Sequence, residues 1–596
     1  MKTSRREFIG GGSATLMGAA MGVHGMKQTP EDKMPGAPPA FATAPPVGPA
    51  VDAATFAEAE KLERVTNSAA HRAEMAQSWP QAMAPLYARR TGPNKVEFAE
   101  TLFPASGWNP MIPGAQTGPQ RNVFVPALPD AGKLPERDED IAFAAVWQLA
   151  HWIKTRQMTP TRLTEIYLDR LKKYDGELRC VITLTEELAR AQAKQADAEI
   201  AAGRYRGPLH GIPWGAKDLL DTANIPTTYG AAPFRNRIPD KNAVVVDRLE
   251  QAGAVLVAKL SLGALALNDI WFGGQTMNPW LLQEGSSGSS AGPGAAVGAG
   301  LVGFAIGSET EGSIVSPSMR CGVTGLRPTY GRVPRTGAMT LCWSLDKLGP
   351  MARTVEDTML VLHAISGPDA GDLDSRPSYL FYDATVPVKG LKVGYFPEWM
   401  KQATDVDRHA LETLKELGLE PVEVSLPKLP YDSLNVILFA EAAASFEKIT
   451  LDGQVDEMKM QVPDAWPNIF RQSRFLSAVD YVQTDRLRRL GAEAMAQIFD
   501  KVDLLQVPSL QDTTLTLTNF TGHPSLTLRA GFVEVSQARS DWAPNPAMPL
   551  PSFNPPRRVP QGITLIGKLF DEGTIVRTGK ALEHRLNVWQ ERPQGF

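Results

Sequence analysis

Residues Gly285–Pro317, which read GSSGSSAGPGAAVGAGLVGFAIGSETEGSIVSP, form the most informative stretch of the chain. Gly, Ser and Ala make up 21 of its 33 residues, a composition shared with flexible linkers. Its centre is nevertheless apolar, with Val297, Leu301 and Phe304 among the small residues, so the stretch predicts a tightly packed turn and helix. Small residues let backbones approach closely and leave amide N–H groups free to point into a site.

Hydroxyls and free N–H groups together are what acyl transfer requires, namely a nucleophile and preorganised donors for an oxyanion. A serine also needs a base. The segment Leu209–Leu220 (LHGIPWGAKDLL) places one lysine, Lys217, in a mostly apolar run. Burial disfavours an ammonium ion and lowers its pKa toward the range of a general base. The alternative is that Lys217 forms a structural ion pair with Asp218.

The two stretches together resemble the amidase signature family. Gly211-Ile212-Pro213 followed by Lys217-Asp218 is similar to its lysine motif, and Ser289 and Ser313 are 24 residues apart, as in its Gly/Ser-rich signature. The resemblance covers roughly residues 140 to 590. It continues through three further segments, Cys321–Val333 (CGVTGLRPTYGRV), Trp343–Asp357 (WSLDKLGPMARTVED) and Asn519–Pro524 (NFTGHP).

The resemblance implies a catalytic triad in which Ser313 is the nucleophile, Ser289 is a bridging serine and neutral Lys217 is the base. It also implies a cis peptide bond between Gly288 and Ser289. The oxyanion hole would consist of the backbone N–H groups of Thr310, Glu311, Gly312 and Ser313. Supporting roles fall to Ser290, Ser308 and Asp346.

The sequence departs from the family pattern at several positions. Glu311 replaces a glycine, and Val315 replaces an arginine. The glutamate is expected to alter the oxyanion loop or to bring a negative charge to the mouth of the site, and the missing arginine removes a buried ion-pair partner. Ala291 and Pro293 also differ from the usual residues.

Hydrophobic patterning over the rest of the chain predicts an α/β fold. β-type runs at 254–258, 391–396 and 504–507 alternate with amphipathic segments at 141–155, 159–174, 405–417 and 479–499. The resemblance makes this expectation specific: an amidase-signature fold, with a central mixed, twisted β-sheet covered by helices on both faces. The catalytic domain is expected to span residues 140–596.

The residues before this domain fall into three predicted parts. Residues 1–28, with Arg5-Arg6 and a weakly apolar run, are similar to a twin-arginine (Tat) signal peptide, which predicts the Tat export machinery as a partner and a periplasmic or secreted location. The run is too short and glycine-rich for a stable membrane anchor. Residues 29–50 are a Pro/Ala-rich linker, and residues 51–139 are an N-terminal extension that wraps the catalytic domain.

Composition narrows the choice of partners. The 61 Lys and Arg residues nearly balance the 65 Asp and Glu residues, and a net charge of −4 argues against nucleic acid and anionic membranes. Cys180, Cys321 and Cys342 are expected to be buried thiols. The histidines show no metal-ligand spacing, so neither a metal nor a cofactor is expected. A small-molecule or peptide amide remains the expected substrate; the oligomeric state is open.

Four alternatives remain open. Gly288–Gly292 satisfies the nucleophile-elbow pattern GxSxG, which would make Ser290 the nucleophile of an α/β-hydrolase-like esterase with His523 as its base. Ser445-Phe446-Glu447-Lys448 matches SxxK of penicillin-binding enzymes, without its companion motifs. A third alternative is a non-catalytic binding protein with a degenerate site. The fourth is the glutaminase component of a tRNA amidotransferase, a function that export from the cytoplasm would argue against.

The Tat assignment makes a direct prediction. Replacing Arg5 and Arg6 together by Lys is expected to retain the protein in the cytoplasm, because the receptor reads the paired arginines and not merely positive charge. Cell fractionation measures the outcome, with Lys2→Arg as the charge-conserving control. Undiminished export of the double variant would contradict the assignment.

Overall fold

Strand β9 (Phe304–Glu309), inside the Gly/Ser-rich stretch, shows how the fold is built. All six of its residues are buried. Phe304 and Ile306 belong to the larger apolar core, whereas Ala305 belongs to a second core that includes Ala295 and Ala296. Because side chains alternate along a strand, the sheet is covered on both faces at this position.

The central sheet of this computed structural model is mixed. Parallel pairs join β3 to β4 and to β9, and antiparallel pairs join β9 to β11 and β16 to β17. The order is β14-β13-β15-β17-β16-β10-β11-β9-β3-β4-β2. The other strands are β2 (Val181–Leu184), β3 (Pro213–Lys217), β4 (Val255–Leu260), β10 (Thr324–Arg327), β11 (Lys347–Ala352), β13 (Lys392–Tyr395), β14 (Glu420–Glu423), β15 (Leu504–Pro508), β16 (Ser525–Gln537) and β17 (Ser552–Gly567).

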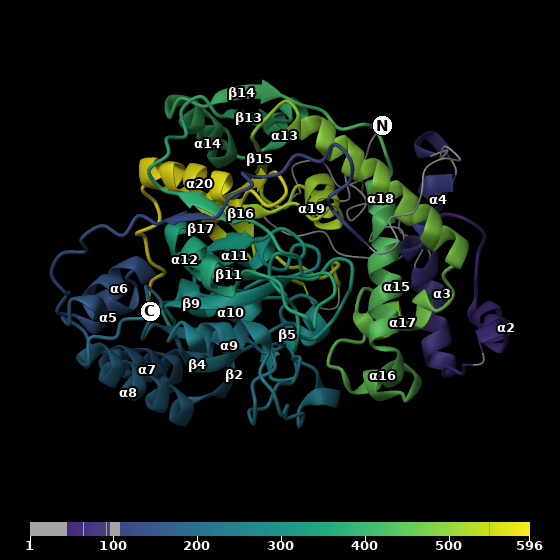
Figure 1. Ribbon diagram of the computed structural model, residues 1–596. Helices are drawn as coiled ribbons and strands as arrows, with labels where there is room; N and C mark the ends of the chain where they lie inside the picture. The colour runs from purple at the N-terminus through teal and green to yellow at the C-terminus, as the bar shows by residue number, and fades with distance from the viewer. Residues whose placement is uncertain (1–44, 64, 91, 96–107, 547–548) are drawn as a thin grey trace.

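Helices cover both faces of this sheet, as expected (Figure 1). One group contacts β3, β4 and β9 and shares the second core, namely α7 (Pro160–Leu178), α8 (Glu186–Ala201) and α10 (Ala291–Gly298). In a second group, α12 (Val355–Ile365) contacts β10 and β11, and α20 (Glu572–Leu586) contacts β16. Helices α6 (Val146–Lys154), α9 (Val244–Gln251) and α20 all pack on α12. The short α11 (Val315–Cys321) packs on α10, β16 and β17. The chain therefore has the predicted α/β architecture, a mixed sheet with helices on both faces.

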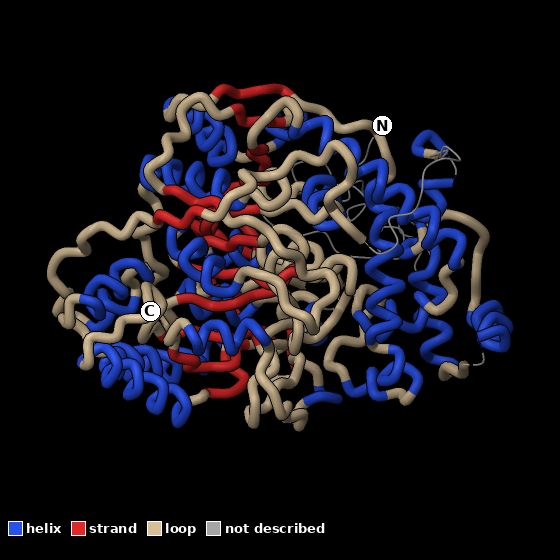
Figure 2. Tube along the Cα trace, in the orientation of Figure 1, coloured by secondary structure: helices blue, strands red, loops and turns tan. Residues whose placement is uncertain are grey.

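A separate group of helices lies beside the sheet, at the right of Figure 1 and in blue in Figure 2. The amide of Asn468 donates to Ser78 Oγ at 2.8 Å, and the Ser433 hydroxyl donates to the carbonyl of Pro85 at 2.6 Å, so residues before 90 are bonded to this group. Its members are α2 (Ala53–Glu63), α3 (Ala69–Ala82), α4 (Ala84–Arg90), α15 (Asn435–Ser445), α16 (Glu447–Leu451), α17 (Trp466–Ser473) and α18 (Ala478–Phe499).

Most of the local predictions hold, with one correction. Thr159 caps α7 by accepting from the N–H of Arg162, and Pro160 occupies the first turn, as its sequence predicts. The segment 141–155 is not one helix, because Ala145 is extended and separates α5 (Asp138–Ala142) from α6.

The remaining α-helices and strands are α13 (Pro397–Gln402), α14 (Asp405–Glu416), α19 (Asp512–Phe520), β1 (Val123–Val125), β5 (Ile270–Trp271), β6 (Gly274–Gln275), β7 (Met277–Asn278), β8 (Leu281–Gly285) and β12 (Phe381–Asp383).

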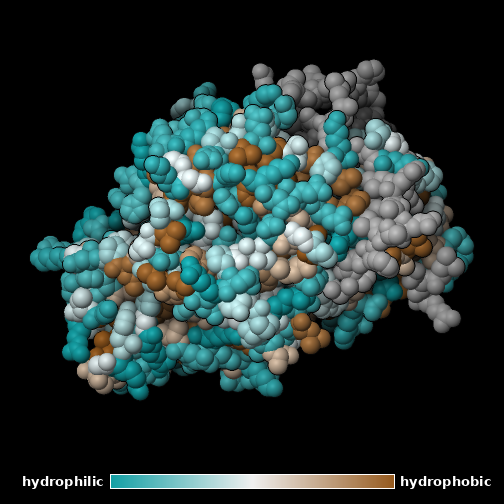
Figure 3. Space-filling view, turned by 45° about the horizontal axis from the view of Figure 1, so that its top comes forward, coloured by the Kyte–Doolittle hydropathy of each residue, from teal (hydrophilic) through white to brown (hydrophobic). Residues whose placement is uncertain are grey.

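The structure describes residues 45–63, 65–90, 92–95, 108–546 and 549–596. The predicted signal peptide and most of the linker lie outside these residues. In the described part, no helix combines the length and apolarity needed to cross a bilayer. The face shown in Figure 3 is mainly hydrophilic, with apolar side chains in small scattered groups.

The central position of β9 gives a stability prediction. Phe304 is fully buried, so Phe304→Ala is expected to lower the free energy of unfolding by about 3–5 kcal/mol through lost burial and the cavity left behind. Leu451→Ala is the control, because Leu451 is 52% exposed. Chemical denaturation measures both, and equal losses would contradict the assigned core.

Candidate active site

The amine of Lys217 lies at the centre of a cluster of serine hydroxyls. Lys217 ends β3, and its side chain is fully buried. Its Nζ lies 2.8 Å from Ser289 Oγ, 3.0 Å from Ser290 Oγ and 2.8 Å from Ser308 Oγ. Ser308 is on the neighbouring strand β9, and the two other serines lie between β8 and α10. Three segments distant in sequence therefore meet at one nitrogen.

The hydroxyl hydrogens limit how this cluster is bonded. Ser290 Oγ donates to the carbonyl oxygen of Ser308 at 3.1 Å, so toward Lys217 it is an acceptor. A neutral amine has two N–H donors and one lone pair. One of the other two hydroxyls, Ser289 or Ser308, can then donate to that lone pair. The geometry thus suits an uncharged lysine as well as an ammonium ion.

Burial favours the uncharged form. It lowers the pKa of Lys217 well below its ordinary value, against the charges of Asp346 and Glu309, which act in the opposite direction. Among the described residues, no carboxylate lies within ion-pair distance of this amine. The alternative of a Lys217–Asp218 pair is wrong, because Asp218 pairs with Lys259 at 3.0 Å, both side chains being fully buried.

Ser289 and Ser313 come together beside the cluster. The Gly288–Ser289 peptide bond is cis, as the resemblance implies. The N–H of Ser290 donates to the carbonyl oxygen of Ser313 at 3.1 Å, which fixes the two segments to each other. No hydrogen bond joins the Ser289 and Ser313 hydroxyls, and Ser313 Oγ has no partner among the described residues.

Ser313 forms part of the wall of a pocket between the sheet and the separate helices. In the described part of the chain, the backbone N–H groups of Gly312 and Ser313 donate to no other residue. Gly312 has a φ of +96°, which a glycine adopts without steric cost. The pocket is lined by Ala266, Leu267, Asn268, Gly288, Thr310, Glu311, Gly312, Ser313, Ser316, Leu341, Leu438, Trp466, Leu515 and Asp541.

Asp346 supports the loop that carries these N–H groups. Its carboxylate accepts from the Thr310 hydroxyl at 2.7 Å and from the N–H groups of Leu341 and Cys342 at 2.8 and 3.0 Å. It is bonded to neither Lys217 nor Ser313. Asp346 therefore connects the Thr310–Ser313 loop to the pocket wall at Leu341.

The two departures beside the nucleophile have structural explanations. Residue 315 is not an arginine, and buried Glu309 pairs instead with Arg327 at 2.7 Å. Glu309 also accepts hydrogen bonds from the N–H groups of Ile314 and Val315. Glu311 does not adopt a positive φ, so this position does not require glycine. Its carboxylate accepts from the Thr516 hydroxyl at 2.7 Å, at the edge of the pocket.

The structure adds a supporting group that the sequence did not reveal. Asp541 accepts from the N–H of Gly288 at 3.1 Å and from the Ser287 hydroxyl at 2.7 Å, and it pairs with Arg320 at 3.1 Å. Asp541 also affects a second buried carboxyl group, Asp269. Burial and the charge of Asp541 raise the pKa of Asp269 to about 7. Asp541 lies in a Pro-rich loop more than 200 residues from Ser313, and no motif marks it.

The other candidate nucleophiles are not arranged for catalysis. Ser290 is fully buried, and the ring of His523 bonds to the Thr521 hydroxyl and stacks on Phe499. Ser445 donates to the carbonyl of Thr340, while Lys448 bonds to Asp452. The residues before the GxSxG elbow form a strand, β8. Among the described strands it pairs only with β7, outside the central sheet.

A sequence model of the family described as Amidase matches residues 162–576, which is more than half of the chain. The chain belongs to the amidase family. It is accordingly an enzyme that acts on amide C–N bonds, and the interpretation as a binding protein without catalysis is not supported.

Several known proteins are similar to this amidase. A Glutamyl-tRNA(Gln) amidotransferase subunit from Anaeromyxobacter dehalogenans is 33% identical over 74% of this chain and 96% of its own length. The native peptide amidase of Stenotrophomonas maltophilia has a TM-score of 0.62 and 27% identity, over 76% of this chain and 98% of that one. A bacterial aryl acylamidase, at 21% identity and a TM-score of 0.62, covers 76% and 99% and shares the fold.

The electrostatics of Lys217 give a pH prediction. The charge of Asp346 favours the ammonium form, so Asp346→Asn is expected to lower the pKa of Lys217 further. If the neutral amine is the active form, the acidic limb of kcat/KM moves to lower pH. Asp405→Asn is the control, since Asp405 is almost fully exposed. A shift to higher pH would contradict the assignment.

Proposed function

We propose that this amidase hydrolyses carboxamides through an acyl-enzyme on Ser313. The Ser313 hydroxyl attacks the amide carbonyl while its proton passes by way of Ser289 to neutral Lys217. The negative charge that develops on the carbonyl oxygen is met by backbone N–H groups of Thr310, Glu311, Gly312 and Ser313. The proton then returns to the departing nitrogen, which leaves as ammonia or an amine, and water releases the carboxylate from Ser313.

The observation that carries this proposal is the buried amine of Lys217, which is surrounded by three serine hydroxyls and, within the described residues, by no carboxylate. A lysine kept for stability alone would be expected to have a partner of opposite charge, as Lys259 has in Asp218. Gly288, which precedes Ser289 in the chain, lines the same pocket as Ser313. The chain itself supplies the nucleophile, the bridging hydroxyl and the base.

The substrate we propose is a small-molecule or peptide amide with an apolar group next to the carbonyl. The pocket beside Ser313 has apolar walls from Leu267, Leu438 and Trp466, while Glu311 contributes a carboxylate at its edge. Such a lining favours apolar over anionic groups. The resemblance of residues 1–28 to a Tat signal peptide supports a periplasmic or secreted location.

A second candidate function is the glutaminase component of a tRNA amidotransferase. The curated relatives are named as subunits of glutamyl-tRNA(Gln) amidotransferase, and two of them are 33% and 34% identical over about three quarters of this chain. That function would place the enzyme in the cytoplasm with other subunits. The Arg5-Arg6 segment favours the first candidate.

The roles in the triad can be tested by substitution. Ser313→Ala, Ser289→Ala and Lys217→Ala are each expected to reduce kcat by about 10⁴-fold or more, because the three groups act as a unit. The measurement is ammonia or amine release, with folding checked by thermal melting. Ser366→Ala, remote from the pocket, is the control and should retain full activity. Activity that survives in Ser313→Ala would contradict the nucleophile.

The same assay separates the two candidate functions. The purified chain alone is expected to turn over simple amides and peptide C-terminal amides. An enzyme that hydrolyses only glutamine, and only together with other subunits, would favour the amidotransferase candidate.

A further inference from the structure

A second pocket is lined by Trp343 and Ser344, which follow Leu341 of the pocket beside Ser313 in the chain. Helix α15 contributes to both pockets, with Leu438 lining the first and Glu441 lining the second. The second pocket also receives Asp485 and Arg488 from α18. Its walls contain none of the residues in the proposed catalytic mechanism.

Four aromatic side chains dominate the walls of this pocket: Trp108, Tyr330, Trp343 and Tyr481. Trp343 is 48% exposed, which is unusual for so large an apolar surface and typical of a binding residue. Two cation–π contacts already exist here: the Arg488 guanidinium lies 3.7 Å from the ring centre of Trp108, and the Arg335 guanidinium lies 5.1 Å from that of Tyr330. Within the described residues, no cation lies over the rings of Trp343 or Tyr481.

The charged side chains of the pocket are mainly negative. Three carboxylates line it, from Asp374, Glu441 and Asp485, against the one guanidinium of Arg488. That guanidinium donates to two backbone carbonyls, those of Phe520 at 2.6 Å and Ser344 at 2.7 Å.

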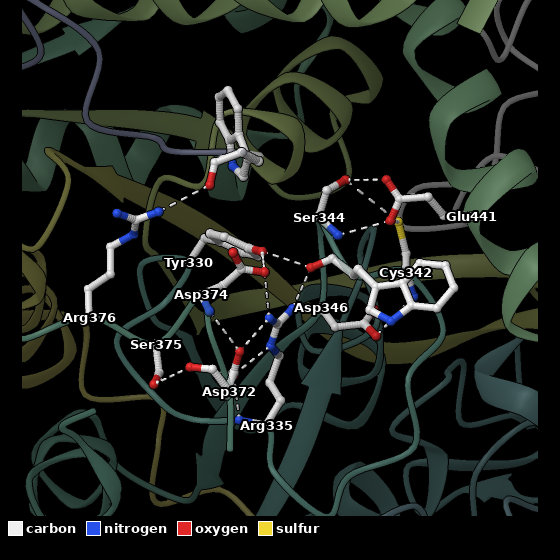
Figure 4. Close-up of polar contacts among 12 residues, drawn as sticks. Tyr330, Arg335, Cys342, Ser344, Asp346, Asp372, Asp374, Ser375, Arg376 and Glu441 are labelled. Atoms are coloured by element: carbon white, nitrogen blue, oxygen red, sulfur yellow. Dashed lines mark hydrogen bonds and ion pairs between the residues drawn. The ribbon is translucent and has the colours of Figure 1, made fainter. Parts of the chain in front are cut away.

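Hydrogen bonds hold two of these carboxylates in place (Figure 4). Asp374 lies 3.0 Å from Arg335 and 2.6 Å from the Tyr330 hydroxyl. Glu441 accepts from the N–H and hydroxyl of Ser344 at 2.9 and 2.6 Å. Both carboxylates are therefore preorganised in the pocket wall and need no rearrangement to face a ligand.

We propose that this pocket binds an organic cation. The cationic group lies between the rings of Trp343 and Tyr481, where aromatic faces and carboxylates both favour positive charge. The site is independent of Ser313 chemistry, so its ligand need not be an amide.

Choline is a suitable probe, because its trimethylammonium group is an organic cation of the kind that aromatic faces bind. Its neutral isostere, 3,3-dimethyl-1-butanol, has the same shape and hydroxyl without the charge. Calorimetric titration of the full-length protein is expected to show saturable binding of choline, and binding of the isostere at least about tenfold weaker. Equal binding of the two compounds, or no saturable binding of choline, would overturn the proposal.

A substitution in the wall locates the binding. Trp343→Ala is expected to weaken choline binding at least about tenfold without unfolding the chain, because this side chain is half exposed. The backbone carbonyl of Trp343, which accepts from Arg335 and Tyr330, is unchanged by the substitution. Leu451→Ala, another exposed apolar residue, should bind choline as the wild type does. Unaltered binding in Trp343→Ala would overturn the proposal.

Discussion

The structure depends on keeping one lysine amine away from both water and carboxylates. An ammonium ion in such a place carries a desolvation penalty that only a close counter-ion offsets. Lys217 receives hydroxyls instead of a counter-ion, so its pKa falls and the neutral form becomes accessible. The proposed mechanism uses this neutral amine as the base that accepts a proton from a serine hydroxyl.

The fold meets this constraint by giving the nearby carboxylates other partners. Asp218, the residue next to Lys217, pairs with Lys259 on β4. Glu309, on the adjacent strand β9, pairs with Arg327 on β10. Each of these ion pairs neutralises a carboxylate that would otherwise favour the ammonium form of Lys217. Loss of Arg327 would leave Glu309 buried without its ion-pair partner, close to the amine.

Much of the fold and site was predictable from local sequence, because the information lies in short segments. Runs of buried β-type residues predicted β4, β13 and β15, and the Gly/Ser-rich stretch predicted a packed turn and helix that became α10. The serines and the lysine were found through spaced motifs. The cluster itself required the resemblance, since no local rule brings residue 217 to residue 289.

Contacts between distant segments were not predictable in the same way. Asp541 supports Gly288 from a Pro-rich loop without a motif, and Leu438 and Trp466 reach the pocket from a region whose sequence shows no specificity pattern. The break at Ala145 depends on tertiary contacts, because the N–H groups of Val146 and Trp147 donate to buried Asp357. Such positions are fixed by packing and not by periodicity.

The charge of Lys217 at neutral pH is the quantity on which the account rests. Nitrogen-15 NMR of lysine-labelled protein, with Lys217→Met to assign the resonance, measures it directly across a pH titration. A side-chain nitrogen that has the shift of a free amine at pH 7 and titrates only below it agrees with the account. An ammonium resonance that persists above pH 9 would contradict it.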